Sequence, residues 1–379
     1  MTQRIVFKLK NESTLFCNKF ECFEIVGYTI QWLFSIHLKS YNIYSIMDFK
    51  KYASIENSDR AEIIEKIKEQ GFYDHEYVVQ EKVHGANVCF ITDGTQVVTA
   101  KRTGLVTSDE KFYNIETVQE KYTPRILLLY NIISVRFEDI SQIAVYGELF
   151  GGLYPHPEVK KKPDAVRLQK GIYYSPDNEF YAFDILINNY QYLNTDIVNE
   201  LFEAAGFIYA KTLFRGSLEE CLKYPNKFQS QISRWLGLPQ FEENICEGVV
   251  IRPVEPCFFG NHARVMLKNK NEKWEEKSYQ KKRKPIEKEE GALSEAAQNL
   301  MEEVARYITE NRLNNVISKI GEVTQKESGK ILGLLGKDSL EDFLKDYQLD
   351  YENLEKNEQK AINKFVNAEA VKLVKAYFK

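Results

Sequence analysis

The sequence predicts an α+β fold, in which a domain built on antiparallel sheets is followed by a small all-α domain. Short runs rich in β-branched and aromatic residues, separated by turn signals, recur up to about residue 271. The stretch 272–291 is dense in Lys and Glu and almost free of aliphatic residues, as in a solvated linker. From residue 292 onward, Leu, Ile, Val and Phe recur at three- and four-residue steps, which indicates helices.

The elements of the first domain can be placed in order. Asp93-Gly94 is a two-residue hairpin signal between two of the expected strands. Gly71 can end the first helix, because glycine readily adopts the left-handed backbone found there. We expect helices over 57–70, 195–205 and 217–224, and strands over 77–82, 87–92, 95–100, 143–148, 180–187, 248–251 and 264–267.

Four segments are expected along the 379 residues. They are an N-terminal extension of unknown role (1–46), the α+β domain (47–275), a charged linker (276–291) and the helical domain (292–379). Met47 opens a second plausible start, MDFKKYASIEN, because the residues before it look foreign to the rest.

Bulk charge and cysteine usage constrain the setting. The formal net charge is −4, so any nucleic-acid-binding surface must be a local basic patch. The apolar stretch 22–38 is interrupted by Glu24, Gln31 and His37 and falls short of a membrane span. With no signal peptide evident, we expect a cytoplasmic protein without membrane attachment and with reduced thiols. Its cysteines, at 17, 22, 89, 221, 246 and 257, lack the spacing of a zinc site.

Lys82 is the candidate nucleophile. It opens the tetrapeptide Lys82-Val83-His84-Gly85, a K-x-x-G pattern that occurs five more times in the chain and is uninformative alone. Lys82 stands apart because it ends a β-rich run, and because Gly85 lets the backbone approach a ligand closely. Asn87 adds a polar group next to this loop.

Several cations could lower the pKa of such a lysine and bind phosphate oxygens. A lysine attacks phosphorus only as the neutral amine, whereas its ordinary pKa is about 10.4. Arg102 lies in AKRTG, and Lys268 and Lys270 lie in MLKNK. Two lysines in a K-x-K pattern on a strand point to the same face, which suits a triphosphate.

Two carboxylates in apolar surroundings indicate a metal or a polar ligand. Glu148 lies in AVYGELFGG and Glu247 in CEGVVIRP. Buried carboxylates are costly unless they are paired or bind a metal, and Mg²⁺ takes one or two of them together with phosphates. Phe183 in FYAFDI could stack on a base, and Asp184 could orient a polar group.

Each residue also has a structural explanation when taken singly. Lys82 could be a surface lysine, and Phe183 could be a core residue. His84 and Asn87 could be a structural histidine and a turn residue. The remaining charged candidates could be solvated or salt-bridged: Arg102, Glu148, Glu247, Lys268 and Lys270.

In their order, these motifs resemble the covalent nucleotidyltransferase superfamily of polynucleotide ligases and capping enzymes. They are most similar to the RNA ligase 2 family of nick-sealing RNA ligases. The resemblance covers 47–275 and extends to the helical tail only in type. It rests on EKVHGAN (81–87), KRTG (101–104), YGELFGG (146–152), FYAFDI (180–185), EGVVIRP (247–253) and LKNK (267–270).

The resemblance implies a role for each matching residue. Lys82 would take AMP, Glu247 would bind the metal, and Asp184 would support the site. His84 matches the family's motif histidine. The ATP-binding residues would be Glu81 and Val83 beside the adenine, Asn87 and Arg102 at the ribose and phosphate, Glu148 at the ribose, Phe183 stacked on the base, and Lys268 and Lys270 at the phosphates. One departure is Ala86, where relatives often have Thr.

The implied activity is ATP-dependent joining of RNA 3′-OH and 5′-phosphate ends, at nicks in duplex RNA. It would use a lysyl-AMP intermediate, Mg²⁺ or Mn²⁺, and RNA as partner, and we expect a monomer. One alternative is a DNA ligase or a capping enzyme, but those families append a β-rich domain where this tail is helical. The other is a non-catalytic RNA-binding protein on the same fold, which label transfer from ATP would distinguish.

Overall fold

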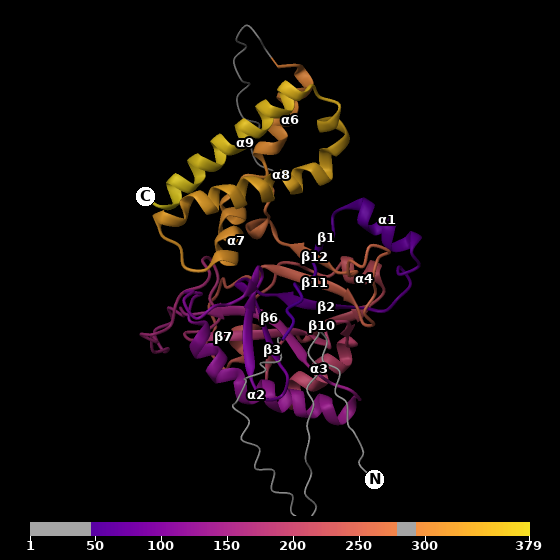
Figure 1. Ribbon diagram of the computed structural model, residues 1–379, viewed down its shortest axis with the longest axis vertical. Helices are drawn as coiled ribbons and strands as arrows, with labels where there is room; N and C mark the ends of the chain where they lie inside the picture. The colour runs from indigo at the N-terminus through magenta and orange to yellow at the C-terminus, as the bar shows by residue number, and fades with distance from the viewer. Residues whose placement is uncertain (1–46, 279–292) are drawn as a thin grey trace, which may run out of the picture. The chain divides into compact units, whose positions relative to one another are not determined.

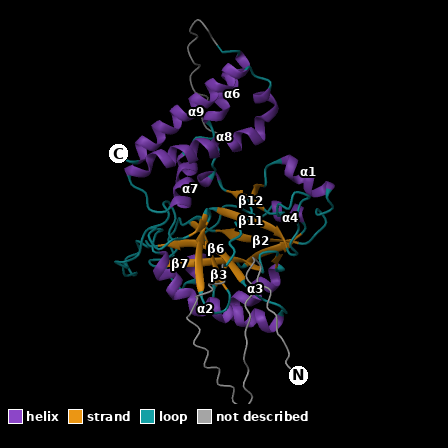
Figure 2. Cartoon of the chain, viewed as in Figure 1, coloured by secondary structure: helices purple, strands orange, loops and turns teal. Residues whose placement is uncertain are grey.

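The α+β prediction is confirmed: two sheets precede a set of helices in the computed structural model, which describes residues 47–278 and 293–379 (Figure 1). The extension 1–46, with its apolar stretch, lies outside the described residues, as does most of the expected linker. Figure 2 colours helices, strands and loops separately: within the described residues, all strands come before residue 271, and the C-terminal part contains helices and loops. The four expected segment boundaries remain a prediction.

The first sheet has five strands. Its neighbouring strands are antiparallel, apart from the parallel pair β1–β12. The order is β1 (Glu56–Asn57), β12 (Leu267–Lys270), β11 (Gly248–Pro253), β2 (Tyr77–Lys82) and β10 (Thr212–Gly216). Helices α1 (Ala61–Glu69) and α4 (Leu218–Leu222) contribute Ile67, Leu218 and Cys221 to the core on one face of this sheet.

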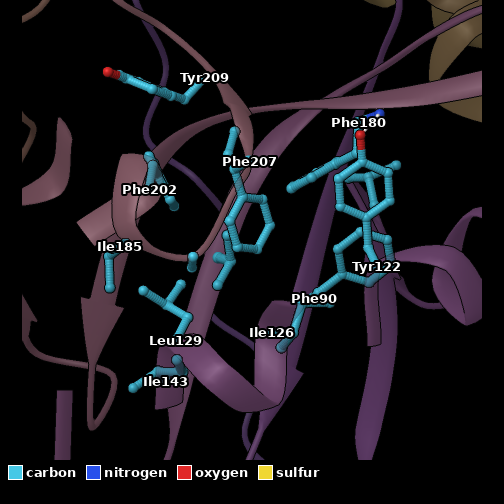
Figure 3. Packing of buried hydrophobic residues seen from close by; sticks show 14 of the residues in the cluster. Phe90, Tyr122, Ile126, Leu129, Ile143, Phe180, Ile185, Phe202, Phe207 and Tyr209 are labelled. Atoms are coloured by element: carbon cyan, nitrogen blue, oxygen red, sulfur yellow. Dashed lines mark hydrogen bonds between the residues drawn. The ribbon is translucent and has the colours of Figure 1, made fainter. Parts of the chain in front are cut away.

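The second sheet has seven strands. Its order is β5 (Gly104–Leu105), β4 (Val97–Lys101), β3 (Ala86–Thr92), β6 (Ile143–Gly151), β7 (Asn178–Ile187) and β8 (Gln191–Tyr192), with β9 (Ile208–Tyr209) parallel to β7. Helices α2 (Ile115–Arg136) and α3 (Thr195–Ala204) cover one face. Figure 3 shows this core, where Tyr122 and Ile126 of α2 pack near Phe90 and Phe180 of the sheet. The two sheets thus have separate outer cores, and their other faces carry both further apolar clusters and the residues that line the site.

Three local predictions were wrong in detail. The first helix begins at Ala61, because Glu56–Asn57 forms β1 instead of a cap. The Asp93-Gly94 hairpin has a longer loop, since the Asp93 side chain accepts hydrogen bonds from the backbone N–H groups of Thr95 and Gln96. The last strand runs over Leu267–Lys270 and not over 264–267, because the Arg264 side chain turns into a buried ion pair.

The C-terminal part is helical throughout its described residues, as predicted. It contains α6 (Glu295–Ala305), α7 (Glu310–Ile320), α8 (Ser328–Glu352) and α9 (Lys356–Tyr377), besides a short 3-10 turn before α8. Two apolar clusters join these helices to one another. Two shorter helical elements of the first part are α5 (Ile232–Trp235) and the 3-10 helix η1 (Glu272–Trp274).

Two further expectations concern membranes and thiols. Within 47–278 and 293–379, no helix combines the length and apolarity needed to cross a membrane. Cys89, Cys221, Cys246 and Cys257 are buried free thiols, and the other two cysteines lie outside the described residues.

Candidate active site

All but two of the predicted site residues line a single cavity of about 380 Å³. The exceptions are Glu247, which contacts two of the lining lysines, and Asp184, which is buried behind the wall. The predicted residues that line the cavity are Glu81, Lys82, Val83, His84, Asn87, Arg102, Glu148, Phe183, Lys268 and Lys270. Motifs from both sheets therefore converge on one place.

Strand register explains why the charged residues of the first sheet meet. Gly248 of β11 is paired with Lys82 of β2 on one side and with Lys270 of β12 on the other. Three neighbouring strands therefore reach the same level of the sheet at these positions, and Glu247 directly precedes Gly248. Antiparallel pairing alone brings together residues that are more than 160 positions apart in sequence, as for the Lys82–Glu247 pair.

Two glycines allow this close approach. A Cβ on Gly248 would lie 2.1 Å from the carbonyl oxygen of Asn269, and its φ of +144° is unfavourable for other residues. A Cβ on Gly85 would lie 2.1 Å from the carbonyl oxygen of Leu149 in β6. Gly85 therefore lets the loop after Lys82 cross the second sheet closely, a packing role that the sequence analysis had assigned to ligand approach.

Glu247 is the centre of a buried charge cluster. Its Oε2 accepts a hydrogen bond from Lys82 Nζ at 2.8 Å, and its Oε1 lies 2.9 Å from Lys270 Nζ. Burial raises the pKa of Glu247, but Lys270 and Lys82 outweigh burial and lower this pKa to about 2. Burial lowers the pKa of His84, whose Nδ1 lies 3.7 Å from Glu247, to about 4. At neutral pH the site therefore holds an ionised Glu247 and an uncharged His84.

The lysine pair on β12 faces the same cavity. Burial lowers the pKa of Lys268, whereas Glu247 and Glu276 outweigh burial and raise the pKa of Lys270. Lys268 and Lys270 lie on one face of the strand, as the K-x-K pattern predicts. The cluster has the cationic character that phosphate oxygens require.

The second sheet supplies the other wall. Glu148 of β6 is directly opposite Asn87 of β3 and Tyr181 of β7. Burial raises the pKa of Glu148 to about 7, despite the opposing effect of Lys82. Arg102 donates hydrogen bonds to the Tyr52 carbonyl at 3.1 Å and to Ser54 Oγ at 3.3 Å, so it holds the segment before β1 against the cavity.

A β-bulge places Phe183. Tyr146 and Gly147 of β6 are paired with Asp184 and Ala182, so Phe183 is the additional residue of β7. Its ring lies 5.0 Å from that of Tyr52 and lines the cavity. The position suits a side chain that stacks on a base.

Asp184 points away from the cavity into a buried network. Its carboxylate pairs with Arg264 and with Arg252, the latter at 3.2 Å, and accepts a 2.7 Å hydrogen bond from the Tyr52 hydroxyl. Burial raises the pKa of Asp184, but the two arginines outweigh it and lower the pKa below its ordinary value. Asp184 therefore supports the Tyr52–Phe183 pair from behind.

Glu81 and Val83, the residues on either side of Lys82, have different surroundings. The Glu81 carboxylate accepts hydrogen bonds from Ser230 Oγ at 2.6 Å and from the Gln231 N–H at 2.8 Å. The Glu81 side chain thus ties β2 to the start of α5, and burial raises its pKa to about 7. Val83 is buried beside Trp274, within the cluster under the cavity floor.

Sequence reasoning missed several lining residues. Tyr52 lies in the segment MDFKKYASIEN, which was singled out without a role. Arg312 lies on the apolar face of α7, one turn before Val316, and is 1% exposed. A charge on the apolar stripe of a helix was the available signal. Glu276 also lines the cavity and had been assigned to the linker.

Two family models match the chain, one over the part with the two sheets and one over the helical C-terminal part. A family model described as RNA ligase matches residues 75–270, more than half of the chain. A second model, T4 RNA ligase 2 C-terminal, matches residues 290–372. Mitochondrial RNA-editing ligase 1 of Trypanosoma brucei brucei is 28% identical, over 88% of this chain and 83% of that protein. Mitochondrial RNA-editing ligase 2 of the same organism is also 28% identical, over 87% of this chain and 91% of that protein.

Among solved structures, the RNA ligase of Naegleria gruberi with PPi matches with 14% identity and a TM-score of 0.37. The match covers 59% of this chain and 58% of that one, a little over half its length. At this TM-score the likeness supports no conclusion about this chain. The family models and the trypanosome relatives confirm the resemblance that the motifs indicated. The chain belongs to the RNA ligase family, and specifically to its RNA ligase 2 branch.

Proposed function

We propose that this protein is an ATP-dependent RNA ligase that joins 3′-OH and 5′-phosphate ends at nicks in duplex RNA. The observation that carries the proposal is the position of Lys82 at the end of β2. Its Nζ is 2.8 Å from Glu247 and shares a cavity with Lys268, Lys270 and the ring of Phe183. Nucleophile, phosphate-binding cations and base-stacking ring thus surround one space.

The first step forms lysyl-AMP. Lys82 Nζ attacks the α-phosphorus of ATP; a P–N bond forms, the bond to pyrophosphate breaks, and the amine loses a proton. Lys268 and Lys270 stabilise the charge on the departing phosphates. Glu247 accepts a hydrogen bond from Lys82, so it orients the amine in the resting site. Phe183 and Glu148 serve the adenine and the ribose.

Two transfers to RNA follow. An RNA 5′-phosphate oxygen attacks the adenylate phosphorus and displaces Lys82, which leaves AMP linked to the RNA 5′ end. The 3′-OH then attacks the 5′-phosphate phosphorus and expels AMP. The same cations that receive the triphosphate are suited to these phosphoryl groups.

A divalent cation fits the residues of the site. Glu247 and Glu148 lie close enough for their charges to interact, and Mg²⁺ or Mn²⁺ takes one or two carboxylates plus phosphate oxygens. The described residues hold no group of three or more candidate protein ligands, which agrees with a site that the substrate phosphates complete. When bound, the ion would neutralise charge on the reacting phosphates.

The cellular setting and the oligomeric state remain predictions. The trypanosome relatives are named as mitochondrial proteins, whereas we proposed a cytoplasmic setting for this one. We also propose a monomer with an adenylyltransferase domain over 47–275 and a helical domain over 292–379 that engages RNA. The described C-terminal residues are helical, which disfavours a DNA ligase or capping enzyme with an appended β-rich domain.

Labelled ATP tests the proposal. The wild-type chain should keep the label from α-labelled ATP through denaturing electrophoresis, and Lys82→Ala should lose it. Lys326→Ala is the matched control, because Lys326 opens another K-x-x-G on an exposed turn. Matched nicks that differ only in RNA or DNA at the 3′-OH side then test the substrate class. Full labelling of the Lys82 variant, or preference for DNA, would contradict the proposal.

A further inference from the structure

Glu276 presents a carboxylate to the lysines that bind phosphate. Its Oε1 lies 2.6 Å from Lys270 Nζ and 3.9 Å from Lys268 Nζ. The side chain lines the cavity and is 19% exposed. Burial raises the pKa of Glu276, but Lys270, Lys268 and Arg312 outweigh burial and hold this pKa well below its ordinary value. An anion therefore already pairs with Lys270 and lies near Lys268.

The same carboxylate reaches the helical part of the chain. Asn315 of α7 donates a hydrogen bond to Glu276 Oε1 at 2.8 Å, and Arg312 Nη1 is 3.8 Å from Oε2. The guanidinium of Arg312 also pairs with Asp338 and Asp342 of α8, each at 2.7 Å. Glu276 thus connects β12 with α7, and Arg312 continues the connection to α8; both helices line the cavity.

Side chains at the start of α7 donate hydrogen bonds to the backbone of the segment that carries Glu276. The Thr309 hydroxyl donates to the Glu276 carbonyl at 3.1 Å. Asn311 Nδ2 donates to the carbonyls of Lys273 and Glu275, at 2.9 and 2.8 Å. A change in the position of residues 273–276 would therefore break these hydrogen bonds or move α7.

We propose that Glu276 occupies the place of the ATP triphosphate on Lys268 and Lys270, and that ATP displaces it and loosens the contact with α7. This inference rests on the proposed function, because it needs a triphosphate at the lysine pair. A carboxylate that stayed in place would lie against the incoming phosphates, and like charges that close repel each other. Release of Glu276 removes this repulsion and also the ion pair and hydrogen bond that it makes with α7.

The competing explanation is that Glu276 only positions the lysines. The two explanations predict opposite signs. If the carboxylate competes with phosphate, its removal tightens phosphate binding; if it positions the lysines, its removal weakens phosphate binding. AMP lacks the β- and γ-phosphates, so its affinity should depend less on the competition than that of ATP or tripolyphosphate.

The test measures equilibrium binding by calorimetry in the full chain carrying Lys82→Ala, which prevents turnover. Adding Glu276→Gln should tighten binding of ATP and of inorganic tripolyphosphate at least about fivefold, with a smaller change for AMP. Glu272→Gln is the matched control: Glu272 is exposed on η1, and its loss changes net charge equally. Weaker or unchanged tripolyphosphate binding in the Glu276 variant would overturn the inference.

Hydrogen exchange of the unmutated chain gives a second measurement that does not depend on how the variant folds. Tripolyphosphate should speed amide exchange in α7, and AMP should not. Slower or unchanged exchange in α7 would overturn the inference. If the unmutated chain neither binds tripolyphosphate nor keeps label from ATP, the proposed function fails instead, which distinguishes the two claims.

Discussion

The two sheets contribute different halves of the site in different ways. The first sheet brings Lys82, Glu247 and Lys270 together through the matched ends of β2, β11 and β12. The second sheet presents Phe183 from a bulge and Glu148 from mid-strand. Under the proposed function, phosphate chemistry therefore depends on strand register, whereas base stacking by Phe183 depends on a local irregularity. Variants on the two sheets should accordingly have separable effects on the same substrate.

The largest effect is expected on the first sheet. Glu247→Ala and Lys270→Ala should each lower the rate of adenylylation by about 10²–10³, the usual cost of removing one preorganised charge contact. The Glu247 change also leaves Lys82 and Lys270 without their shared carboxylate. Single-turnover labelling at saturating ATP measures this rate. Near-normal labelling in either variant would show that the charge cluster is structural.

The next largest effect is expected from removing the helical C-terminal region. A chain that ends at Glu290 should still form lysyl-AMP but should seal nicked duplex poorly, because the helices supply lysines for the phosphate backbone. Its affinity for nicked RNA should also depend less steeply on salt than that of the full chain. Both activities are measured on one preparation. Unimpaired sealing would exclude a role for the helices in RNA engagement.

The second sheet should show a smaller and different effect. Phe183→Ala should weaken binding of AMP and ATP by the same factor, up to about tenfold, since a ring contact contributes about 0.5–1.5 kcal/mol. Phe183→Tyr keeps the ring and should restore affinity. Lys270→Ala, in contrast, should weaken ATP more than AMP. Calorimetry on the Lys82→Ala background separates these patterns, and equal losses for both ligands in both variants would remove the division between the sheets.

The smallest effect is a dependence of stability on pH. The folded pKa of Glu148, about 7, is above its ordinary 4.5, so the folded chain keeps a proton that the unfolded chain has lost. The contribution of Glu148 to stability is present below pH 4.5 and is lost as pH rises through 7. Glu148→Gln removes this dependence, so its free energy of unfolding relative to wild type should rise between pH 5 and 8 by an amount of the order of 1 kcal/mol, seen as a rise in relative Tm. Parallel Tm curves would contradict the raised pKa.

More of the candidate site than of the surrounding fold could be predicted from the sequence. Lys82 and Glu247 could be predicted because each borders a recognisable β-rich run, and β2 was placed residue by residue. Helix α2 had no predicted counterpart: it contains Pro124, and its low amphipathicity obscures the helical period. Strand pairing determines which distant residues lie side by side, and a single sequence does not reveal that pairing.

The role of a side chain also depends on which way it points. Glu81 was predicted beside the adenine and Asp184 as a supporting residue, and both are buried with partners that tie strands and loops together. Arg312 was missed because one charge in an amphipathic helix is usually a solvated residue. Its burial became visible only when Glu276, Asp338 and Asp342 were seen around it.

Direct location of the AMP tests the central claim. After incubation with ATP and a divalent cation, the wild-type chain is digested, and the adenylylated peptide is identified by mass spectrometry. We predict one AMP per chain on Lys82, at the end of β2, through a bond that is labile in acid. AMP on Lys268, on Lys270 or on any residue of the second sheet would contradict the account.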